Sequence, residues 1–161
     1  MRRTNQVVVD ACLICDSLIG ELDRRKRARR FLHDLYKAHV VLLAPYSFSG
    51  ESDTAIRQAI HRRGLLESNV PTIYAALDKI PVELLHERTE SHAIRQRARE
   101  IAAMLAQPSV YDSTYTALAE LRGCDFWTAD KRFANVANQN RRQPDGTSTP
   151  TFPFVKFIED Y

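Results

Sequence analysis

The residues Ser109–Asp130, with the sequence SVYDSTYTALAELRGCDFWTAD, predict a helix, a glycine stop and a short strand that ends at an aspartate. Gly123 stands where a glycine is expected, just after a helix C-terminus. A helix of about ten residues is roughly 15 Å long, and a strand at Asp125–Ala129 returns about 16 Å. Because the chain runs out along the helix and back along the strand, we expect Asp112 and Asp130 at the same rim of the domain.

Each aspartate also has a purely structural interpretation. Ser109 is a good N-cap, and an acid such as Asp112 in a first helical turn is favoured by the helix dipole. Asp130 could cap a following helix at Lys131–Asn138. Their convergence on one rim favours a functional role over two separate caps.

The composition is that of one soluble globular domain covering residues 1–161. Hydrophobic residues make up 44% and charged residues 27% of the chain, both ordinary values for such a domain. No apolar run approaches the roughly eighteen residues that a membrane-spanning helix needs, and Asp10 and Asp16 interrupt the apolar start that would suggest a signal peptide. We therefore expect a cytoplasmic protein with no membrane attachment.

Cysteine and basic residues give weaker indications. Cys12, Cys15 and Cys124 are an odd count without an export signal, which argues against a disulfide framework. The spacing of Cys12 and Cys15 matches redox and zinc motifs, including a thioredoxin-like one, but the two apolar residues between them predict small core residues. Six of the seven residues from Arg24 to Arg30 are Lys or Arg, and the net charge of only +3 leaves a solvated helix face or a phosphate-binding patch as alternatives.

Apolar runs and helical periodicity alternate along the chain. Strands are predicted at Gln6–Val9, Val40–Ala44, Val82–Leu85, Asp125–Ala129 and Phe154–Ile158. Further helices are predicted at Ala11–Ile19, Glu21–His39 (burying Leu22, Phe31, Leu32 and Leu35), Ser49–Arg63 with Ser49 as N-cap, 69–80 and Glu90–Leu105. A polar loop is expected at 139–153, before the last strand. Such alternation predicts an α/β fold with a largely parallel sheet between helical layers.

Two more acids are predicted at the rim that Asp112 and Asp130 share. Asp10 ends the first strand, and Glu51 lies in the first turn of the helix after the second strand. In parallel α/β sheets, ligands bind at the carboxyl ends of the strands, where these connections gather. Four carboxylates repel one another unless a cation is present, and an all-oxygen set favours Mg²⁺ or Mn²⁺. Because such a metal can polarise a phosphoryl oxygen, phosphodiester hydrolysis is the natural reaction class.

A different chemistry starts from Asp10 alone. An apolar strand that ends in Asp resembles the start of the haloacid dehalogenase pattern, in which the aspartate is a phosphatase nucleophile. That pattern usually has a second Asp two residues later, where this chain has Cys12. The metal-dependent alternative is therefore favoured.

Four segments together resemble the ordered motifs of PIN-domain ribonucleases, and most of all the VapC-type toxins of type II toxin–antitoxin pairs. The segments are Val7–Ala11 (VVVDA), Pro45 followed six residues later by Glu51, Tyr111–Tyr115 (YDSTY) with Ala117–Ala119, and Thr128–Phe133 (TADKRF). The resemblance implies a three-layer α/β/α fold and a Mg²⁺- or Mn²⁺-dependent endoribonuclease. It also implies a homodimer and a small antitoxin protein that occupies the acidic cleft.

By the same resemblance, Asp10, Glu51 and Asp112 are the principal metal-site acids and Asp130 is the fourth. The family often has Asn three residues after the Glu, where this chain has Thr54, so Asp53 is an alternative to Glu51. A catalytically inactive PIN-like module that binds RNA or a partner is the alternative function. Because an acidic cleft repels RNA, we expect compensating contacts to its phosphates from the basic run, through Arg24, Arg25, Arg27 and Arg30.

Overall fold

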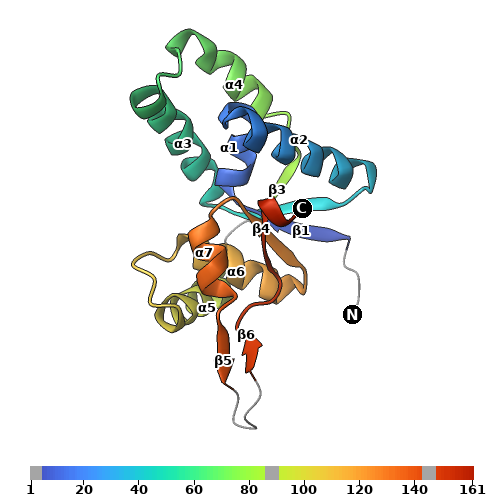
Figure 1. Cartoon of the computed structure of the whole chain (residues 1–161), viewed down its shortest axis with the longest axis vertical. Helices are drawn as coiled ribbons and strands as arrows, with labels where there is room; N and C mark the ends of the chain where they lie inside the picture. The colour runs from blue at the N-terminus through green and yellow to red at the C-terminus, as the bar shows by residue number, and fades with distance from the viewer. Residues whose placement is uncertain (1–4, 86–90, 143–147) are drawn as a thin grey trace.

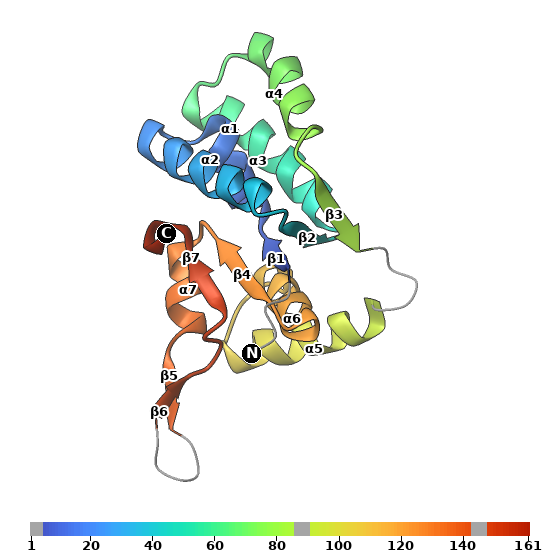
Figure 2. The ribbon, with the colours of Figure 1, turned by 90° about the vertical axis from the view of Figure 1, so that its right-hand side faces the viewer.

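A five-stranded parallel sheet lies at the centre of the protein (Figures 1 and 2). The computed structural model describes residues 5–85, 91–142 and 148–161. The strands are β1 (Gln6–Val9), β2 (Val41–Pro45), β3 (Val82–Leu85), β4 (Asp125–Thr128) and β7 (Val155–Phe157). They lie in the order β3-β2-β1-β4-β7, and all four pairings are parallel. This order puts β1 in the middle, with Val8 opposite Leu43 on β2 and Phe126 on β4.

Helices cover both faces of the sheet, which gives the three-layer α/β/α arrangement. One layer holds α1 (Ala11–Ile19), α2 (Leu22–Lys37), α3 (Phe48–Arg63) and α4 (Val70–Leu77). The other holds α5 (Ser91–Met104), α6 (Tyr111–Arg122) and α7 (Lys131–Ala137). Short 3₁₀ turns lie at Glu67–Asn69 and Ile158–Asp160. The α/β prediction is therefore confirmed.

Neighbouring residues of β4 point into opposite layers. Phe126 stacks on Tyr115 of α6, with ring centroids 5.5 Å apart, and also meets Phe133 of α7 at 6.3 Å. Trp127 packs on the other face against Phe31 of α2, at 4.8 Å. The alternation that a strand imposes on its side chains thus ties both helical layers to the same strand.

Two predicted helix caps are wrong by one or two residues. The N-cap of α6 is Val110, not Ser109, because the Val110 carbonyl already accepts hydrogen bonds from the amide and the hydroxyl of Thr114, at 2.8 and 2.7 Å. The N-cap of α3 is Ser47, and Ser49 lies inside the helix. The predicted glycine stops at Gly64 and Gly123 are confirmed, and both have the positive φ that favours glycine at this position.

The expected polar loop at 139–153 is wrong in part, because it contains a hairpin. Strands β5 (Asn140–Arg142) and β6 (Ser148–Pro150) pair antiparallel and project from the body of the protein (Figure 1). Its tip, 143–147, lies outside the described residues, as do 1–4 and 86–90, with the predicted start of α5 at Glu90.

Burial differs from the prediction at two positions. Leu22, expected in the core, is 56% exposed, and the small Ala28 is buried under α2 together with Phe31. Cys12, expected as a core residue, is exposed, whereas Cys15 is buried. Both differences come from helix phase, which places Leu22 and Cys12 on outward faces. None of the described helices combines the length and apolar character required to cross a bilayer.

Candidate active site

Asp10 is held rigidly at the carboxyl end of the central strand. It is 3% exposed and caps α1, because its Oδ1 accepts a hydrogen bond from the Leu13 amide at 2.6 Å. Its Oδ2 accepts a hydrogen bond from the Thr128 hydroxyl of β4. Burial raises the pKa of Asp10 to about 7 against the lowering effect of these two hydrogen bonds, and the charge of Asp112 raises it further.

Asp112 occupies the middle of the acidic group. It lies in the first turn of α6 and is half-buried. Burial raises the pKa of Asp112 to about 6, and the negative charges of Asp130 and Glu51 add to the rise. Since Asp112 also acts on Asp10, its carboxylate interacts electrostatically with all three other acids.

Asp130 has both of the roles considered from the sequence. Its Oδ1 accepts a hydrogen bond from the Phe133 amide at 2.9 Å, so it caps α7. Its own amide donates to the Thr128 hydroxyl oxygen at 2.9 Å. The Thr128 hydroxyl therefore bridges Asp130 and Asp10, donating to one and accepting from the other. Sequence analysis missed this role of Thr128, although the hydroxyl residue two positions before the motif aspartate was a signal for it.

Glu51, rather than Asp53, faces the other acids. Its Oε1 is buried and has no hydrogen-bond partner among the described residues. Its charge raises the pKa of Asp112 and of Tyr115. Asp53 is exposed, and the group on which its charge acts is the Cys15 thiol. The structure thus places Asp10, Glu51 and Asp130, the other acids that the sequence predicted, within electrostatic range of Asp112.

Tyr115 lies within electrostatic range of two of these acids, Glu51 and Asp10. Its side chain is fully buried, and its hydroxyl has no hydrogen-bond partner within the described part of the chain. Burial raises the pKa of Tyr115 well above its ordinary range, and the charges of Glu51 and Asp10 act in the same direction. Its position in the sequence does not distinguish this tyrosine from an ordinary core residue of α6.

The donor set fits a hard divalent cation. In the ranges 5–85, 91–142 and 148–161, no three Asp, Glu, His or Cys side chains stand close enough to enclose a metal ion, so the carboxylates would have to draw together around one. All four acids nevertheless offer oxygen, which Mg²⁺ and Mn²⁺ prefer. The unpaired, buried Oε1 of Glu51 is the kind of atom that a bound cation would satisfy.

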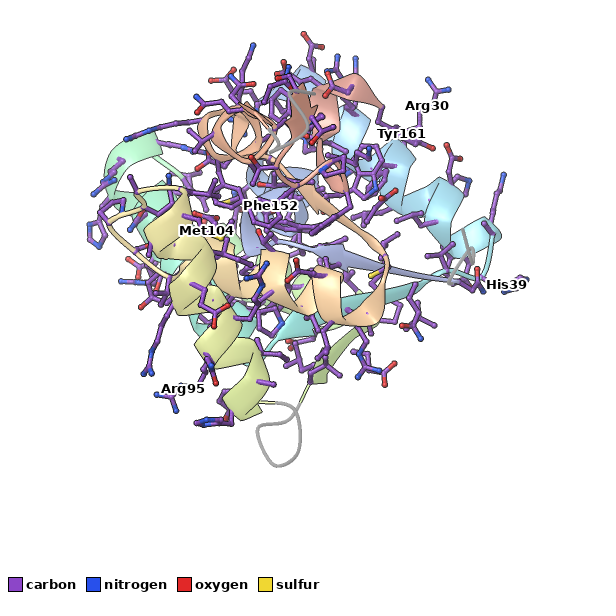
Figure 3. All side chains as sticks on the ribbon, turned by 90° about the horizontal axis from the view of Figure 1, so that it is seen from below. Arg30, His39, Arg95, Met104, Phe152 and Tyr161 are labelled. Carbon is purple, nitrogen blue, oxygen red and sulfur yellow. The ribbon has the colours of Figure 1, made fainter. Side chains whose placement is uncertain are left out.

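The predicted RNA-binding run is only partly directed toward this site. Arg24 forms an ion pair with Asp16 of α1, with 2.6 Å between Nη2 and Oδ2, and lines a pocket that borders Asp130. Arg27 donates to the Glu159 carbonyl at 3.4 Å. Arg30 lies 3.9 Å from a carboxylate one turn along α2 and points outward (Figure 3). Neither Arg25, Arg27 nor Arg30 lines that pocket.

Comparison with known proteins adds nothing to this geometry. A scan against models of protein families gives no match for the chain, and a search of curated proteins gives none either. Any function assigned to the acidic group therefore rests on its residues and on the motifs that they form.

Proposed function

We propose that this protein is a Mg²⁺- or Mn²⁺-dependent endoribonuclease of the PIN-domain type. The observation that carries the proposal is the convergence of four carboxylates, from four separate segments, at the carboxyl edge of a parallel sheet. Asp112 interacts electrostatically with Asp10, Glu51 and Asp130. Such an arrangement is costly without a cation, and the motifs around the four acids support RNA as the substrate.

The chain's own residues position the carboxylates. Thr128 holds the Asp10 carboxylate and the backbone amide of Asp130 through its bridging hydroxyl, and the Phe133 amide holds the Asp130 carboxylate. Asp10, Glu51, Asp112 and Asp130 would together hold the ion. A divalent cation at this site supplies polarisation of a phosphoryl oxygen and stabilisation of the charge that develops on phosphodiester cleavage.

Binding of a divalent cation would displace protons from the carboxyl groups of Asp10 and Asp112. Asp10 and Asp112, with pKa values of about 7 and about 6, are partly protonated near neutral pH in the metal-free protein. Because a bound cation requires both as carboxylates, loading releases these protons and becomes stronger as pH rises. A nuclease of this type should therefore lose activity as the pH falls through this range.

The sharpest test compares three neighbouring acids. Asp112→Asn and Glu51→Gln should each lower cleavage of a mixed RNA pool in Mn²⁺ by about a hundredfold or more, because each removes a charged oxygen ligand. Asp53→Asn is the matched control and should leave cleavage at the wild-type level, since Asp53 is exposed and is not among the charges that raise the pKa of Asp10 or Asp112. Addition of EDTA should abolish cleavage by the wild-type protein.

Retention of metal-dependent cleavage by both Asp112→Asn and Glu51→Gln would remove the catalytic assignment. Absence of cleavage by the wild-type protein, with RNA binding intact, would instead indicate a catalytically inactive PIN-like module.

The toxin role rests on the motif resemblance alone. We propose that the protein acts in the cytoplasm as a homodimer and is neutralised by a small antitoxin. Expression of the wild-type chain in bacteria should then arrest growth, and Asp112→Asn should not. Relief of the arrest by a small protein encoded beside this one would identify the antitoxin. Unimpaired growth of cells that contain active nuclease would exclude the toxin role while leaving the enzyme assignment in place.

A further inference from the structure

A second feature, a basic pocket, opens beside the acids. Its volume is about 440 Å³, within the range of small-molecule sites. Its charged walls come from α2, α3, the start of α7 and one acid of α1. These residues are Arg24, Arg62, Arg63, Lys131, Arg132 and Asp16. In Figure 1 the start of α7 lies below α1 and α3, at the edge of the sheet where β4 ends.

The basic pocket carries more positive charge than its two acids, Asp16 and Asp130, can neutralise. Asp16 is engaged by Arg24 at 2.6 Å, and its side chain is only 10% exposed. Arg62, Arg63 and Arg132 are exposed and form no ion pair within the described part of the chain. Asp130 lies on the border that the basic pocket shares with the acidic site. The cations therefore outnumber the acids, and three of them are available to an incoming anion.

The basic pocket and the acidic site are continuous. Cys12 lines the pocket, and its thiol is close enough to Asp10 and Asp112 to interact electrostatically with both. Asp130 belongs to the acidic group and also lines the pocket. A strand that places one phosphate at the acids would thus meet the basic pocket next.

The rest of the lining suits a nucleotide better than a bare ion. Ile19, Ala55 and Ala59 supply an apolar surface, and Gln58 supplies an amide that can donate and accept hydrogen bonds. Apolar surface beside a few polar groups is typical of sites that hold an organic ligand together with its charged group.

We propose that the basic pocket binds a phosphate of the RNA strand next to the phosphodiester at the acids. Arg62 and Arg63 provide the contacts from α3, and Lys131 and Arg132 provide those from α7. The inference rests on the proposed function in taking the strand to be RNA. It also changes the emphasis of the sequence analysis, because the proposed phosphate contacts come from two elements, α3 and α7, and not from the basic run of α2.

The test measures binding without cleavage. A fluorescent single-stranded oligoribonucleotide is titrated with protein in EDTA, at several salt concentrations, and anisotropy is recorded. The double variant Arg62→Gln/Arg63→Gln should weaken binding about tenfold or more, as expected for loss of hydrogen bonds to a charged group. It should also flatten the slope of log affinity against log salt by about 0.7, the value for one phosphate neutralised on a single strand. Lys131→Gln/Arg132→Gln should act in the same direction.

The matched control is Arg95→Gln/Arg99→Gln on α5. Both residues are exposed, and Arg95 points into solvent on the opposite layer (Figure 3). This variant removes the same charge and should leave both affinity and slope close to wild type. An equal loss from the pocket and α5 variants would mean a general charge effect and would overturn the proposal, as would an unchanged affinity in both pocket variants.

Two further arms identify the phosphate and the class of ligand. The titrations are repeated with the same oligoribonucleotide carrying either a 5′-hydroxyl or a 5′-phosphate. If the pocket variants weaken binding of both forms, the pocket binds an internal phosphodiester. Loss with the 5′-phosphate alone assigns a terminal phosphomonoester. An acidic peptide is the third probe. If the pocket variants weaken peptide binding and leave RNA binding unchanged, the pocket is a protein site and the proposal is wrong.

This outcome is separate from that of the catalytic test. Asp112→Asn should bind RNA in EDTA at least as well as wild type, since it removes a negative charge outside the basic pocket. Pocket-dependent binding without any cleavage would contradict the proposed enzyme and support the pocket. Cleavage by the wild-type protein together with unchanged RNA binding in the pocket variants would support the proposed enzyme and contradict the proposed pocket.

Discussion

Thr128 shows how much of the acidic site depends on one uncharged side chain. Its hydroxyl donates to Asp10 and accepts from the Asp130 amide, and its side chain is fully buried. A hydroxyl with one proton and two lone pairs can satisfy both neighbours at once. It thus fixes the Asp10 carboxylate relative to the backbone of Asp130. Two strands that pair in register are therefore also joined at their carboxyl ends by side chains.

Asp10 should make the metal-free protein less stable as pH rises. Its pKa is about 7 in the folded protein against an ordinary 3.8, so the folded state holds a proton that the unfolded state has lost between these two values. The free energy of unfolding should fall as pH rises from about 4 to about 7, by at most about 4 kcal/mol from this group. Asp10→Asn should remove much of this fall, because asparagine does not titrate. The variant should still fold, because its amide oxygen can accept the hydrogen bond from the Leu13 amide.

Urea denaturation in EDTA at pH 5 and pH 8 checks this expectation. The wild-type protein should lose more stability between the two values than Asp10→Asn does, and Asp53→Asn should behave as wild type. An equal loss in the wild-type protein and Asp10→Asn would show that Asp10 is ionised without penalty. Excess Mg²⁺ at pH 8 should restore stability to the wild-type protein more than to Asp10→Asn.

The four acids could be predicted from the sequence because each lies beside a strand end or in a first helical turn. The residues that support them could not. Tyr115 has the same spacing as ordinary core residues of α6, and only the fold shows its hydroxyl within electrostatic range of Glu51 and Asp10. The basic pocket could not be predicted for a related reason, since Arg63 and Arg132 lie far apart in sequence and line the same pocket only in the folded chain.

At the scale of single elements, two glycines differ in whether a larger side chain would fit in their place. A Cβ atom added to Gly20, at the end of α1, would lie 2.6 Å from the carbonyl oxygen of Asp16. A Cβ atom added to Gly50, within α3, would have no atom within 4 Å. The first glycine is required by a close backbone approach, and the second is not.

Gly20→Ala should therefore lower the free energy of unfolding by about 1–3 kcal/mol, because backbone atoms must shift to relieve the contact. Gly50→Ala should raise it by about 0.5–1 kcal/mol, since alanine is the better helix former. Urea denaturation of the two variants beside wild type measures both. Equal effects of the two changes would show that the close approach at Gly20 is relaxed at no cost.

The helix starts show where local patterns stop being informative. Ser109 and Ser49 are good N-cap residues by type, yet α6 and α3 begin from the carbonyls of Val110 and Ser47. Neither cap uses a side-chain hydrogen bond. Packing of the helix on the sheet decides which carbonyl accepts the first bond, and that information is not local.

At the scale of the whole molecule, Tyr161 joins distant parts of the chain. Its ring meets Phe31 of α2 at 5.0 Å and Trp127 of β4 at 5.8 Å, both edge-on. Its hydroxyl donates to Asp34, 127 residues earlier, at 2.6 Å. Figure 3 shows it beside α2. The alternation of strands and helices predicted the fold class, but such contacts could not be predicted because they depend on strand order.

Tyr161→Ala should lower the free energy of unfolding by about 1–2 kcal/mol, because it removes two aromatic contacts and a partly buried ring. Tyr161→Phe keeps the ring and should cost less than about 1 kcal/mol, the usual value of one exposed hydrogen bond. Thermal unfolding of the two variants separates these contributions. A larger loss in Tyr161→Phe than in Tyr161→Ala would contradict the assignment to ring packing.

The pairing of β1 with β4 also sets when the protein can become active during its synthesis. Asp10 and Thr128, which the bridge joins, are 118 residues apart, and α6 with Asp112 lies between them. At about 5–20 residues per second, a ribosome needs roughly 6–24 s to make that interval. Until β4 has emerged and paired, a nascent chain holds only part of the acidic site. Under the nuclease function proposed above, an incomplete chain would thus leave intact the message and the ribosome that are making it.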